Sequence, residues 1–314
     1  MTKECKRKSK RTQAWFSQKE QSAGRWRLAV LWALYRFCPL WLFRGALSIV
    51  GTAIWMAAGP AREASRAYRV VLKAAQKRRG RPITPLSGRA HVLAYVTALF
   101  DKVDAAALRK QKLCLEIDQK GDFNQLLAEI KAHHGVFFLC SHVGSIEILQ
   151  SLYTQVSVFP PRVMHAFQDT AQSRIFFDFY RAHCHDPRVF IHPTDAVDVA
   201  TAAEMKQFLD KGELVMMAAD RISKNAPGRQ VTVRLLDRRV PLPHGVFTFA
   251  RLMESPVFFI ACVKTAPDTY TLFTRRAPEV GVAQAYADFL EALILAYPAA
   301  FFQFYDYFGL LNDN

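Results

Sequence analysis

Short apolar runs of strand length recur along residues 91–314 and alternate with stretches of helical character. The run Val136–Cys140 (VFFLC) is long enough for one strand and too short for a helix of ordinary length. Because it is apolar at every position, both of its faces must be covered by other parts of the chain. Buried strands that alternate with amphipathic helices predict an α/β fold, in which a mixed sheet is flanked by helices.

The same reasoning predicts the individual elements. The expected strands are 136–140, 163–167, 189–192, 214–219, 231–236, 256–264 and 270–274. The expected helices are 146–153, 194–211 and 282–297, with Thr194 as the N-cap of the second and Gly212 just past its end. Gly80–Gly88 (GRPITPLSG) contains two prolines and two glycines and is the clearest linker. We therefore expect a head at 1–79, a linker at 80–90 and an α/β domain at 91–314.

The positive charge of the chain lies almost entirely in the first 90 residues. The formal net charge is +15; residues 1–90 carry 20 lysines and arginines against three acids, whereas residues 91–314 carry 22 against 24. A strongly basic chain indicates nucleic acid or an anionic membrane surface as a partner. Nucleic-acid binding requires bases and stacking aromatics across the folded body. Because this body is close to neutral, we expect no nucleic-acid partner and an anionic membrane surface instead.

The basic head contains an apolar segment with membrane character. Leu28–Ala61 has no acid and only two bases, Arg36 and Arg44, and four of the five tryptophans of the chain lie in it or next to it. Tryptophan favours the boundary between headgroups and hydrocarbon. The longest charge-free run, Gly45–Ala61, has 17 residues, whereas a membrane span needs about 20. The segment therefore predicts a membrane-associated helix in the interface, with a single span and a buried helix of a soluble protein as alternatives.

The cysteines and histidines give no sign of a disulfide framework or a metal. The six cysteines are scattered and form no CxxC pair, which favours the cytosolic side of a membrane. Cys140 and Cys262 lie inside apolar runs and are expected to be buried small hydrophobes. The cluster of His183, Cys184 and His185 is read as a group of surface side chains. We expect no metal and no cofactor.

The stretch Gly135–Glu147 (GVFFLCSHVGSIE) is the most informative for chemistry. An apolar strand ends just before His142, and Gly144 and Ser145 then open a helix with Glu147 in its first turn. Ligands of α/β sheets bind at the carboxyl ends of strands, where a histidine can take a proton and a carboxylate can orient it. Backbone amides near Gly144 and at the N-terminus of this helix are expected to face a developing oxyanion. The alternative is a strand-end histidine and a helix-start acid without a catalytic role, since one such spacing is what chance supplies.

The segment from His142 to Glu147 resembles the HxxxxE/D motif of glycerolipid-type acyltransferases, and is most similar to the lipid A late acyltransferases. The resemblance covers most of the chain, because several weaker features follow in the family's order. These are the basic aromatic head, the segment Gly59–Arg66, the strand-like Val215–Arg221 with its final Asp-Arg, the proline-flanked stretch 240–264 and the aromatic tail 298–308.

This resemblance implies a glycerolipid acyltransferase-like fold and transfer of a fatty acyl chain from a thioester, on acyl carrier protein or acyl-CoA, to a hydroxyl or amine of a membrane lipid. His142 is the implied general base and Glu147 the acid that orients it, with no covalent acyl-enzyme. The resemblance also implies a location on the cytoplasmic face of a bacterial inner membrane. A non-catalytic, membrane-associated lipid-binding scaffold on the same fold is the alternative.

Further residues are expected to contact the substrates. Asp220 and Arg221 follow another strand and are expected to bind a phosphate of donor or acceptor, with a surface ion pair as the alternative. His165 is expected to line the pocket, with a satisfied core histidine as the alternative. The full set of expected substrate contacts is Gly144, Ser145, His165, Arg174, Arg181, Asp220, Arg221 and Gly245.

Overall fold

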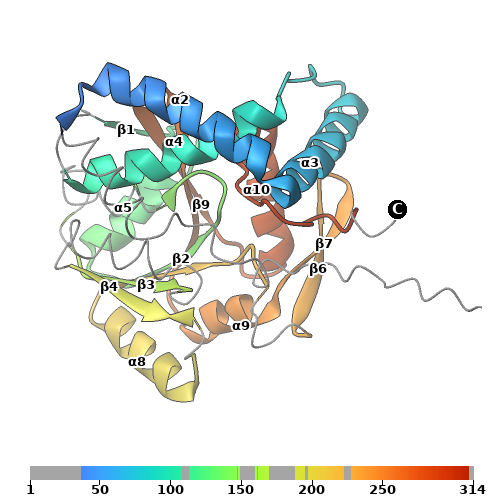
Figure 1. Ribbon diagram of the computed structural model, residues 1–314. Coiled ribbons are helices and arrows are strands. Elements are labelled where there is room, and N and C mark those ends of the chain that lie inside the picture. The colour runs from blue at the N-terminus through green and yellow to red at the C-terminus, as the bar shows by residue number, and fades with distance from the viewer. Residues whose placement is uncertain are drawn as a thin grey trace, which may run out of the picture.

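The computed structural model describes residues 37–107, 113–146, 148, 160, 162–169, 188–194, 197–222 and 228–310. Figure 1 shows the arrangement of their helices and strands. The helices are α2 (Leu40–Ala57), α3 (Gly59–Arg78), α4 (Gly88–Ala107), α5 (Phe123–Lys131), α8 (Val199–Asp210), α9 (His244–Leu252) and α10 (Val282–Ala296), with a short 3₁₀ turn at Pro298–Ala300. The strands are β1 (Cys114–Ile117), β2 (Val136–Cys140), β3 (Met164–Gln168), β4 (Val189–Pro193), β5 (Leu214–Ala218), β6 (Gln230–Leu235), β7 (Arg238–Pro243), β8 (Val257–Ala266) and β9 (Thr269–Arg276).

Seven strands form one mixed sheet in the order β1-β9-β8-β2-β5-β3-β4. The strands β8, β2, β5, β3 and β4 run parallel to one another, and β9 and β1 run in the opposite direction. The remaining two strands, β6 and β7, form a separate antiparallel pair. The predicted α/β class, with a mixed sheet flanked by helices, is confirmed.

The central strand β2 is buried on both faces, as its sequence predicted. Side chains alternate along a strand, so neighbouring residues enter different cores. Phe137 and Leu139 belong to the larger core, to which α3, α8, α9 and α10 contribute. Phe138 and Cys140 belong to the second core, against α5. A run without polar residues is therefore required here, because neither face of β2 meets water.

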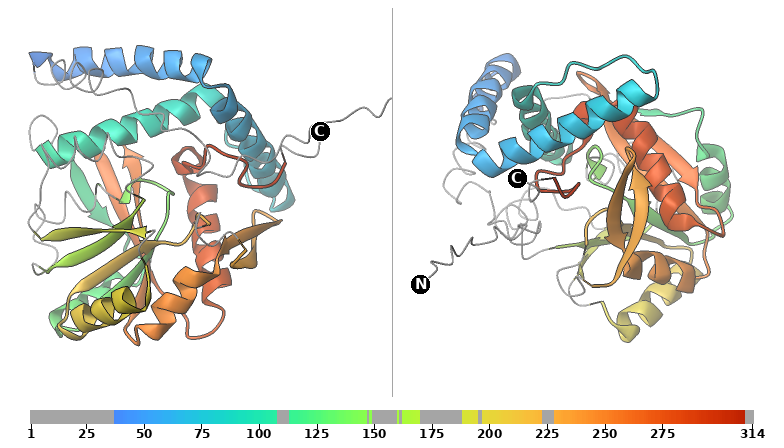
Figure 2. Two further views of the ribbon diagram at one scale, coloured as in Figure 1. Left: turned by 60° about the horizontal axis from the view of Figure 1, so that its bottom comes forward. Right: turned by 90° about the vertical axis from the view of Figure 1, so that its right-hand side faces the viewer.

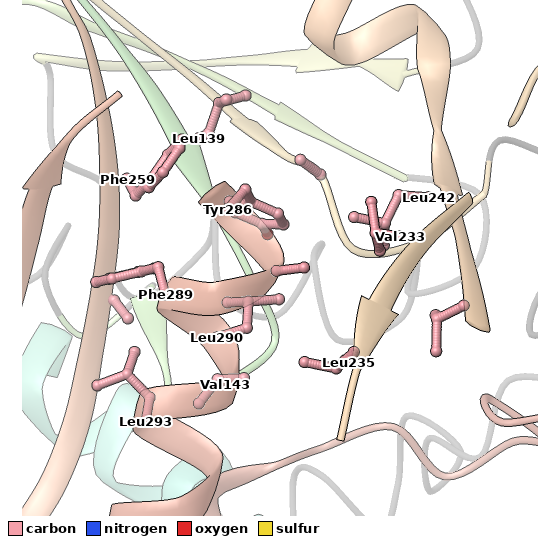
Figure 3. Close-up of a cluster of buried hydrophobic side chains, with 14 of the residues drawn as sticks. Leu139, Val143, Val233, Leu235, Leu242, Phe259, Tyr286, Phe289, Leu290 and Leu293 are labelled. Carbon is pink, nitrogen blue, oxygen red and sulfur yellow. The ribbon is translucent and has the colours of Figure 1, made fainter. Parts of the chain in front are cut away.

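Figure 3 shows part of the larger core around α10. Phe259 of β8 lies next to Leu139 of β2, and its ring contacts Tyr286 and Phe289 of α10, with centroids 5.4 and 5.8 Å apart. On the other side of α10, the side chains of β6 and β7 point toward the same helix. The helix α10 therefore joins the main sheet to the β6–β7 pair.

The N-terminal helices form an outer layer on one side of the sheet. Tyr68 and Leu72 of α3 are buried in the larger core. The helix α2 lies over α4 (Figures 1 and 2), and Leu47 of α2 clusters with Val96 of α4. Residues 81–87 connect α3 to α4 without regular secondary structure. None of the helices within the described ranges combines the length and the apolar character that crossing a bilayer requires.

Two elements differ from the sequence-based expectation. The helix expected from Thr194 begins at Val199, because Asp198 is the N-cap and its carboxylate accepts a hydrogen bond from the amide of Thr201 at 2.8 Å. The segment Arg238–Pro243, for which the sequence predicted no strand, forms β7. Prolines are tolerated there because, among the described residues, β7 pairs with β6 alone. Of the helix expected at 146–153, the structure describes Ile146 and Ile148, and both are helical.

Candidate active site

The register of two neighbouring strands brings His142 and Asp220 together. In the parallel pair β2 and β5, Cys140 lies opposite Ala218. His142 and Asp220 each follow that pair by two residues, so both lie at the edge where the parallel strands end. Their side chains are in contact, with Nδ1 of His142 2.9 Å from Oδ1 of Asp220. The backbone N–H of His142 also donates to Oδ2 of Asp220 at 2.6 Å.

The two side chains of this pair differ sharply in burial. The carboxylate of Asp220 is 1% exposed, whereas the imidazole of His142 is 36% exposed. Burial alone raises the pKa of Asp220, but the His142 and Arg221 charges and the hydrogen bonds from His142 outweigh burial and hold that pKa below its ordinary value. An ionised carboxylate can only accept hydrogen bonds, so Nδ1 of His142 carries a proton. The neutral ring then has its lone pair on Nε2, on the exposed side of the pair.

The ring of His142 has no second partner within the described ranges. No described group is hydrogen-bonded to its Nε2, and no described serine or cysteine contacts it as a nucleophile. The nearby hydroxyl of Ser141 is buried and accepts from the amide of Val143 at 3.1 Å. A histidine oriented by a buried carboxylate, with an open ring nitrogen, can act as a general base toward a bound substrate.

The turn after His142 requires a glycine and uses its own amides. Gly144 has a φ of +78°, and a Cβ added there would lie 2.2 Å from the carbonyl oxygen of Cys262. The amide of Gly144 donates to Ala300, and the amide of Ser145 donates to Cys262, each at 2.8 Å. These two amides therefore already donate within the fold, and an oxyanion site at the other amides of the helix N-terminus stays a prediction.

The C-terminal segment packs against this turn. The amide of Phe302 donates to the carbonyl of His142 at 3.0 Å, and Val143 forms an antiparallel bridge with Phe301. Phe301 is fully buried, and Phe302 is 8% exposed. Aromatic residues of the tail therefore pack the core behind the site.

Gln303 of the same segment touches the carboxylate directly, and the sequence did not single it out. Its Nε2 donates to Oδ2 of Asp220 at 2.7 Å. Arg221 donates from Nε to Oε1 of Gln303 at 2.9 Å and from a terminal nitrogen to the carbonyl of Phe302 at 3.2 Å. Asp220 and Arg221, predicted to bind a substrate phosphate, thus both contact the tail in this structure.

His165 lies elsewhere in the fold. The strand register places it level with Phe137, five residues before His142 and two strands away. It is 3% exposed, and its ring contacts Oε2 of Glu213 at 2.6 Å and Nε2 of His192 at 3.0 Å. Burial, helped by the charge of His165, lowers the pKa of His192. The structure therefore gives His165 the role of a satisfied core histidine and does not bring it to the site.

The other predicted residues are not joined to the site by a described contact. Gly245 lies exposed in the first turn of α9, with nothing within 4 Å of a Cβ built on it. Glu147, Arg174 and Arg181 lie outside the described residues. The pairing of His142 with Glu147 therefore stays a prediction.

The described side chains offer no metal-binding group. Within the parts of the chain that the structure describes, no three His, Cys, Asp or Glu side chains come together to hold an ion. Cys140 and Cys262 are buried in the sheet, as predicted.

The sequence matches no protein-family model, and no curated protein sequence matches it. The fold and the site define an α/β protein with an accessible histidine, paired to a buried carboxylate, at the carboxyl edge of a mixed sheet. The function is inferred from these two features together with the sequence motif.

Proposed function

We propose that this protein is a glycerolipid-type acyltransferase, which moves a fatty acyl chain from a thioester to a hydroxyl or amine of a membrane lipid. The observation that carries the proposal is the contact between the accessible His142 and the buried Asp220 at the carboxyl ends of β2 and β5. Ligands of α/β sheets bind at this edge. The resemblance of the segment from His142 to Glu147 to the acyltransferase motif supports the same chemistry.

In the proposed reaction, Nε2 of His142 takes the proton of the acceptor hydroxyl or amine as that group attacks the thioester carbonyl. A new carbon–oxygen or carbon–nitrogen bond forms, the carbon–sulfur bond breaks, and the proton on His142 passes to the departing thiolate. Asp220 stays ionised and stabilises the imidazolium that forms in between. The transfer is proposed to be direct, without a covalent acyl-enzyme, as the resemblance to the acyltransferase motif implies.

The proposal assigns the orienting carboxylate to Asp220, whereas the motif resemblance implies Glu147. The reason is the 2.9 Å contact between Asp220 and Nδ1 of His142, the ring atom that an orienting carboxylate must hold. The two assignments differ in what single substitutions do, so they can be separated by experiment.

The test is an assay of the purified full chain with acyl carrier protein or CoA thioesters and a bacterial lipid extract, with products detected by mass spectrometry. We expect His142→Gln and Asp220→Asn each to lower kcat by about a thousandfold or more, and Glu147→Gln to have a clearly smaller effect. The matched control is His134→Gln, since His134 also pairs with a carboxylate, Glu129 at 2.7 Å, but on the protein surface. This control should transfer at the wild-type rate.

Two results would contradict these assignments. Wild-type transfer by His142→Gln would exclude the general base, and a loss in Glu147→Gln as large as that in Asp220→Asn would favour the carboxylate implied by the motif. A chain that binds lipid but transfers from neither thioester would support the scaffold alternative. The assay therefore separates the reaction, the residues and the competing function.

We also propose that α2 lies in the interface of an anionic membrane, at the cytoplasmic face of a bacterial inner membrane. Leu42, Ile49 and Met56 are spaced seven residues apart and so share one face of α2. Their exposed fractions are 47%, 74% and 58%, whereas Leu47, which packs against α4, is 5% exposed. An exposed apolar stripe along one face of a helix fits insertion parallel to the membrane surface.

The helix α3 supplies the charge that such a surface requires. Arg62, Arg66, Lys73 and Lys77 are all exposed on its outer side. Each base near an anionic leaflet contributes about 1 kcal/mol of attraction. The bend between α2 and α3 (Figure 2) places the basic helix directly after the apolar one. Apolar insertion and charge attraction can therefore act together.

Binding to vesicles that contain phosphatidylglycerol tests this membrane surface. The double variant Ile49→Glu/Met56→Glu should reduce co-sedimentation by about tenfold or more, because it places two charges on the inserted face. Val280→Glu is the matched control, since Val280 is 86% exposed outside α2. Equal binding of the double variant and the wild type would refute the proposed orientation of α2.

A further inference from the structure

Gln303 is a buried polar residue in an otherwise aromatic stretch of the tail. It is 1% exposed and stands between Phe302 and Phe304. A buried amide destabilises a fold unless its polar atoms are hydrogen-bonded. Here both ends are satisfied, because Nε2 donates to Asp220 at 2.7 Å and Oε1 accepts from Arg221 at 2.9 Å.

Arg221 determines which way round this amide lies. An arginine can only donate hydrogen bonds, so its Nε must face the oxygen of the Gln303 amide. The NH₂ group of the amide therefore faces Asp220. A second bond, from Arg221 to the carbonyl of Phe302, holds the guanidinium against the tail. Rotating the amide would set its oxygen against the carboxylate and its NH₂ group against the guanidinium.

Asp220 consequently receives three donors from two segments of the chain. Oδ2 accepts from the backbone N–H of His142 at 2.6 Å and from Gln303 at 2.7 Å, and Oδ1 faces Nδ1 of His142 at 2.9 Å. Hydrogen bonds to the charged form keep a buried carboxylate ionised. Because Oδ2 is fixed by two different segments, the carboxylate cannot rotate away from the ring.

We propose that Gln303 is a positioning residue for the catalytic pair: its amide, oriented by Arg221, keeps Asp220 ionised and turned toward His142. This inference rests on the acyltransferase function proposed above and extends the site to the C-terminal segment. Gln303 acts through Asp220 and touches neither substrate nor the reacting ring.

The other titratable groups around the carboxylate do not compete for this role. The positive charge of Arg221 helps to lower the pKa of Asp220 and so acts in the same direction as the hydrogen bonds. Burial raises the pKa of Tyr286, Tyr305 and Tyr307 well above the ordinary value of a phenol. These tyrosines are therefore neutral near pH 7 and place no further charge beside the carboxylate of Asp220.

The decisive variant is Gln303→Met, which keeps the approximate side-chain size and removes the donor. Carbon-13 NMR of the aspartate carboxyls in the full chain, with Asp220→Asn to assign the signal, reports the pKa of Asp220 without any catalysis. Losing one hydrogen bond to a buried charge should raise that pKa by about one to two units, a change of about ten- to a hundredfold in proton affinity. In the transfer assay, kcat should fall about tenfold with KM unchanged.

A matched control separates positioning from general packing. Gln76 of α3 is also 1% exposed, and its amide is hydrogen-bonded to Thr84. Gln76→Met should lower stability and leave the Asp220 signal and kcat at wild-type values. An unchanged Asp220 pKa in Gln303→Met overturns the proposal. A shifted pKa in a protein that transfers no acyl chain upholds the positioning and rejects the acyltransferase function.

If Gln303→Met does not fold, a second variant tests whether Gln303 positions Asp220. Gln303→Glu keeps the shape and the acceptor for Arg221, and it sets a carboxyl at 2.7 Å from Asp220 in place of the amide. Two carboxyls at that distance share one proton, so one of them should titrate above about pH 6. We expect kcat to fall when that proton is lost. Carboxyls that all titrate in their ordinary range, with a wild-type pH profile, overturn the proposal.

Discussion

His91 of α4 is hydrogen-bonded to two other segments of the chain, and it is expected to make the fold sensitive to acid. It is fully buried; Nδ1 lies 3.0 Å from the hydroxyl of Ser65 on α3, and Nε2 lies 2.7 Å from the carbonyl oxygen of Phe301. A carbonyl can only accept, so Nε2 carries the proton of a neutral ring. Burial lowers the pKa of His91 to about 4, partly offset by the bond to Phe301 and helped by the charge of Arg69.

The loss of stability in acid follows from the difference between the pKa of His91 in the unfolded chain and its pKa in the fold. A histidine in the unfolded chain has a pKa near 6.5, so below that pH the unfolded chain binds a proton that the fold excludes. The contribution of His91 to stability is fully present above about pH 6.5 and is lost as the pH falls toward 4. From this group alone, the free energy of unfolding should drop by about 2 kcal/mol at pH 5 and about 3 kcal/mol at pH 4.

Urea unfolding of wild type and His91→Gln at pH 7, 6 and 5 measures this contribution. Glutamine can hydrogen-bond but does not titrate, and at pH 7 the variant should be about 1–3 kcal/mol less stable because the buried bonds are disturbed. That difference should shrink by about 2 kcal/mol between pH 7 and pH 5, since all other groups titrate in both chains and cancel. A difference that stays constant with pH would refute a neutral, buried His91.

Two further predictions concern stability, measured by urea unfolding. Gly144→Ala should destabilise the fold by about 2 kcal/mol or more, because alanine is strained at a φ of +78° and its Cβ would lie 2.2 Å from the Cys262 oxygen; Gly245→Ala, with nothing within 4 Å, should be close to neutral. Phe259→Ala should cost about 3–5 kcal/mol because the ring is fully buried, whereas Leu252→Ala, at a side chain that is 60% exposed, should cost less than about 1 kcal/mol. Similar losses within either pair would contradict the packing described.

Strands buried on both faces could be predicted from the sequence, because their composition depends on burial alone. Val136–Cys140 is found with its exact bounds for this reason. The hairpin of β6 and β7 was missed because its turn, Leu236 and Asp237, has φ values of 50° and 62°. Turns of this kind are usually marked by Asn-Gly or Asp-Gly, and here packing stabilises one without that signal. The displaced start of α8 has a similar cause, since Thr194 and Asp198 are both acceptable caps and only tertiary structure chooses between them.

The two residues of the candidate pair could be predicted separately but not as a pair. His142 and Asp220 each follow an apolar strand, and both were placed at carboxyl ends on that ground. Their contact depends on β5 being the neighbour of β2, and strand order arises from long-range packing that no local pattern encodes. The role of Gln303 is even harder to predict from the sequence, because no spacing or motif links a glutamine among aromatic residues to Asp220 or Arg221.

The contacts of the site join residues that lie far apart in the sequence. His142 and Asp220 are 78 residues apart, and Asp220 and Gln303 are 83 residues apart. Contacts of such separation form only after the loop-closure entropy between them has been overcome. The turn at Gly144 is held by Cys262 and Ala300, so even the local geometry around His142 depends on β8 and the tail. No segment of the chain can build the pair alone, and a variant that loosens the tail should therefore lose the orientation of Asp220 before it loses the sheet.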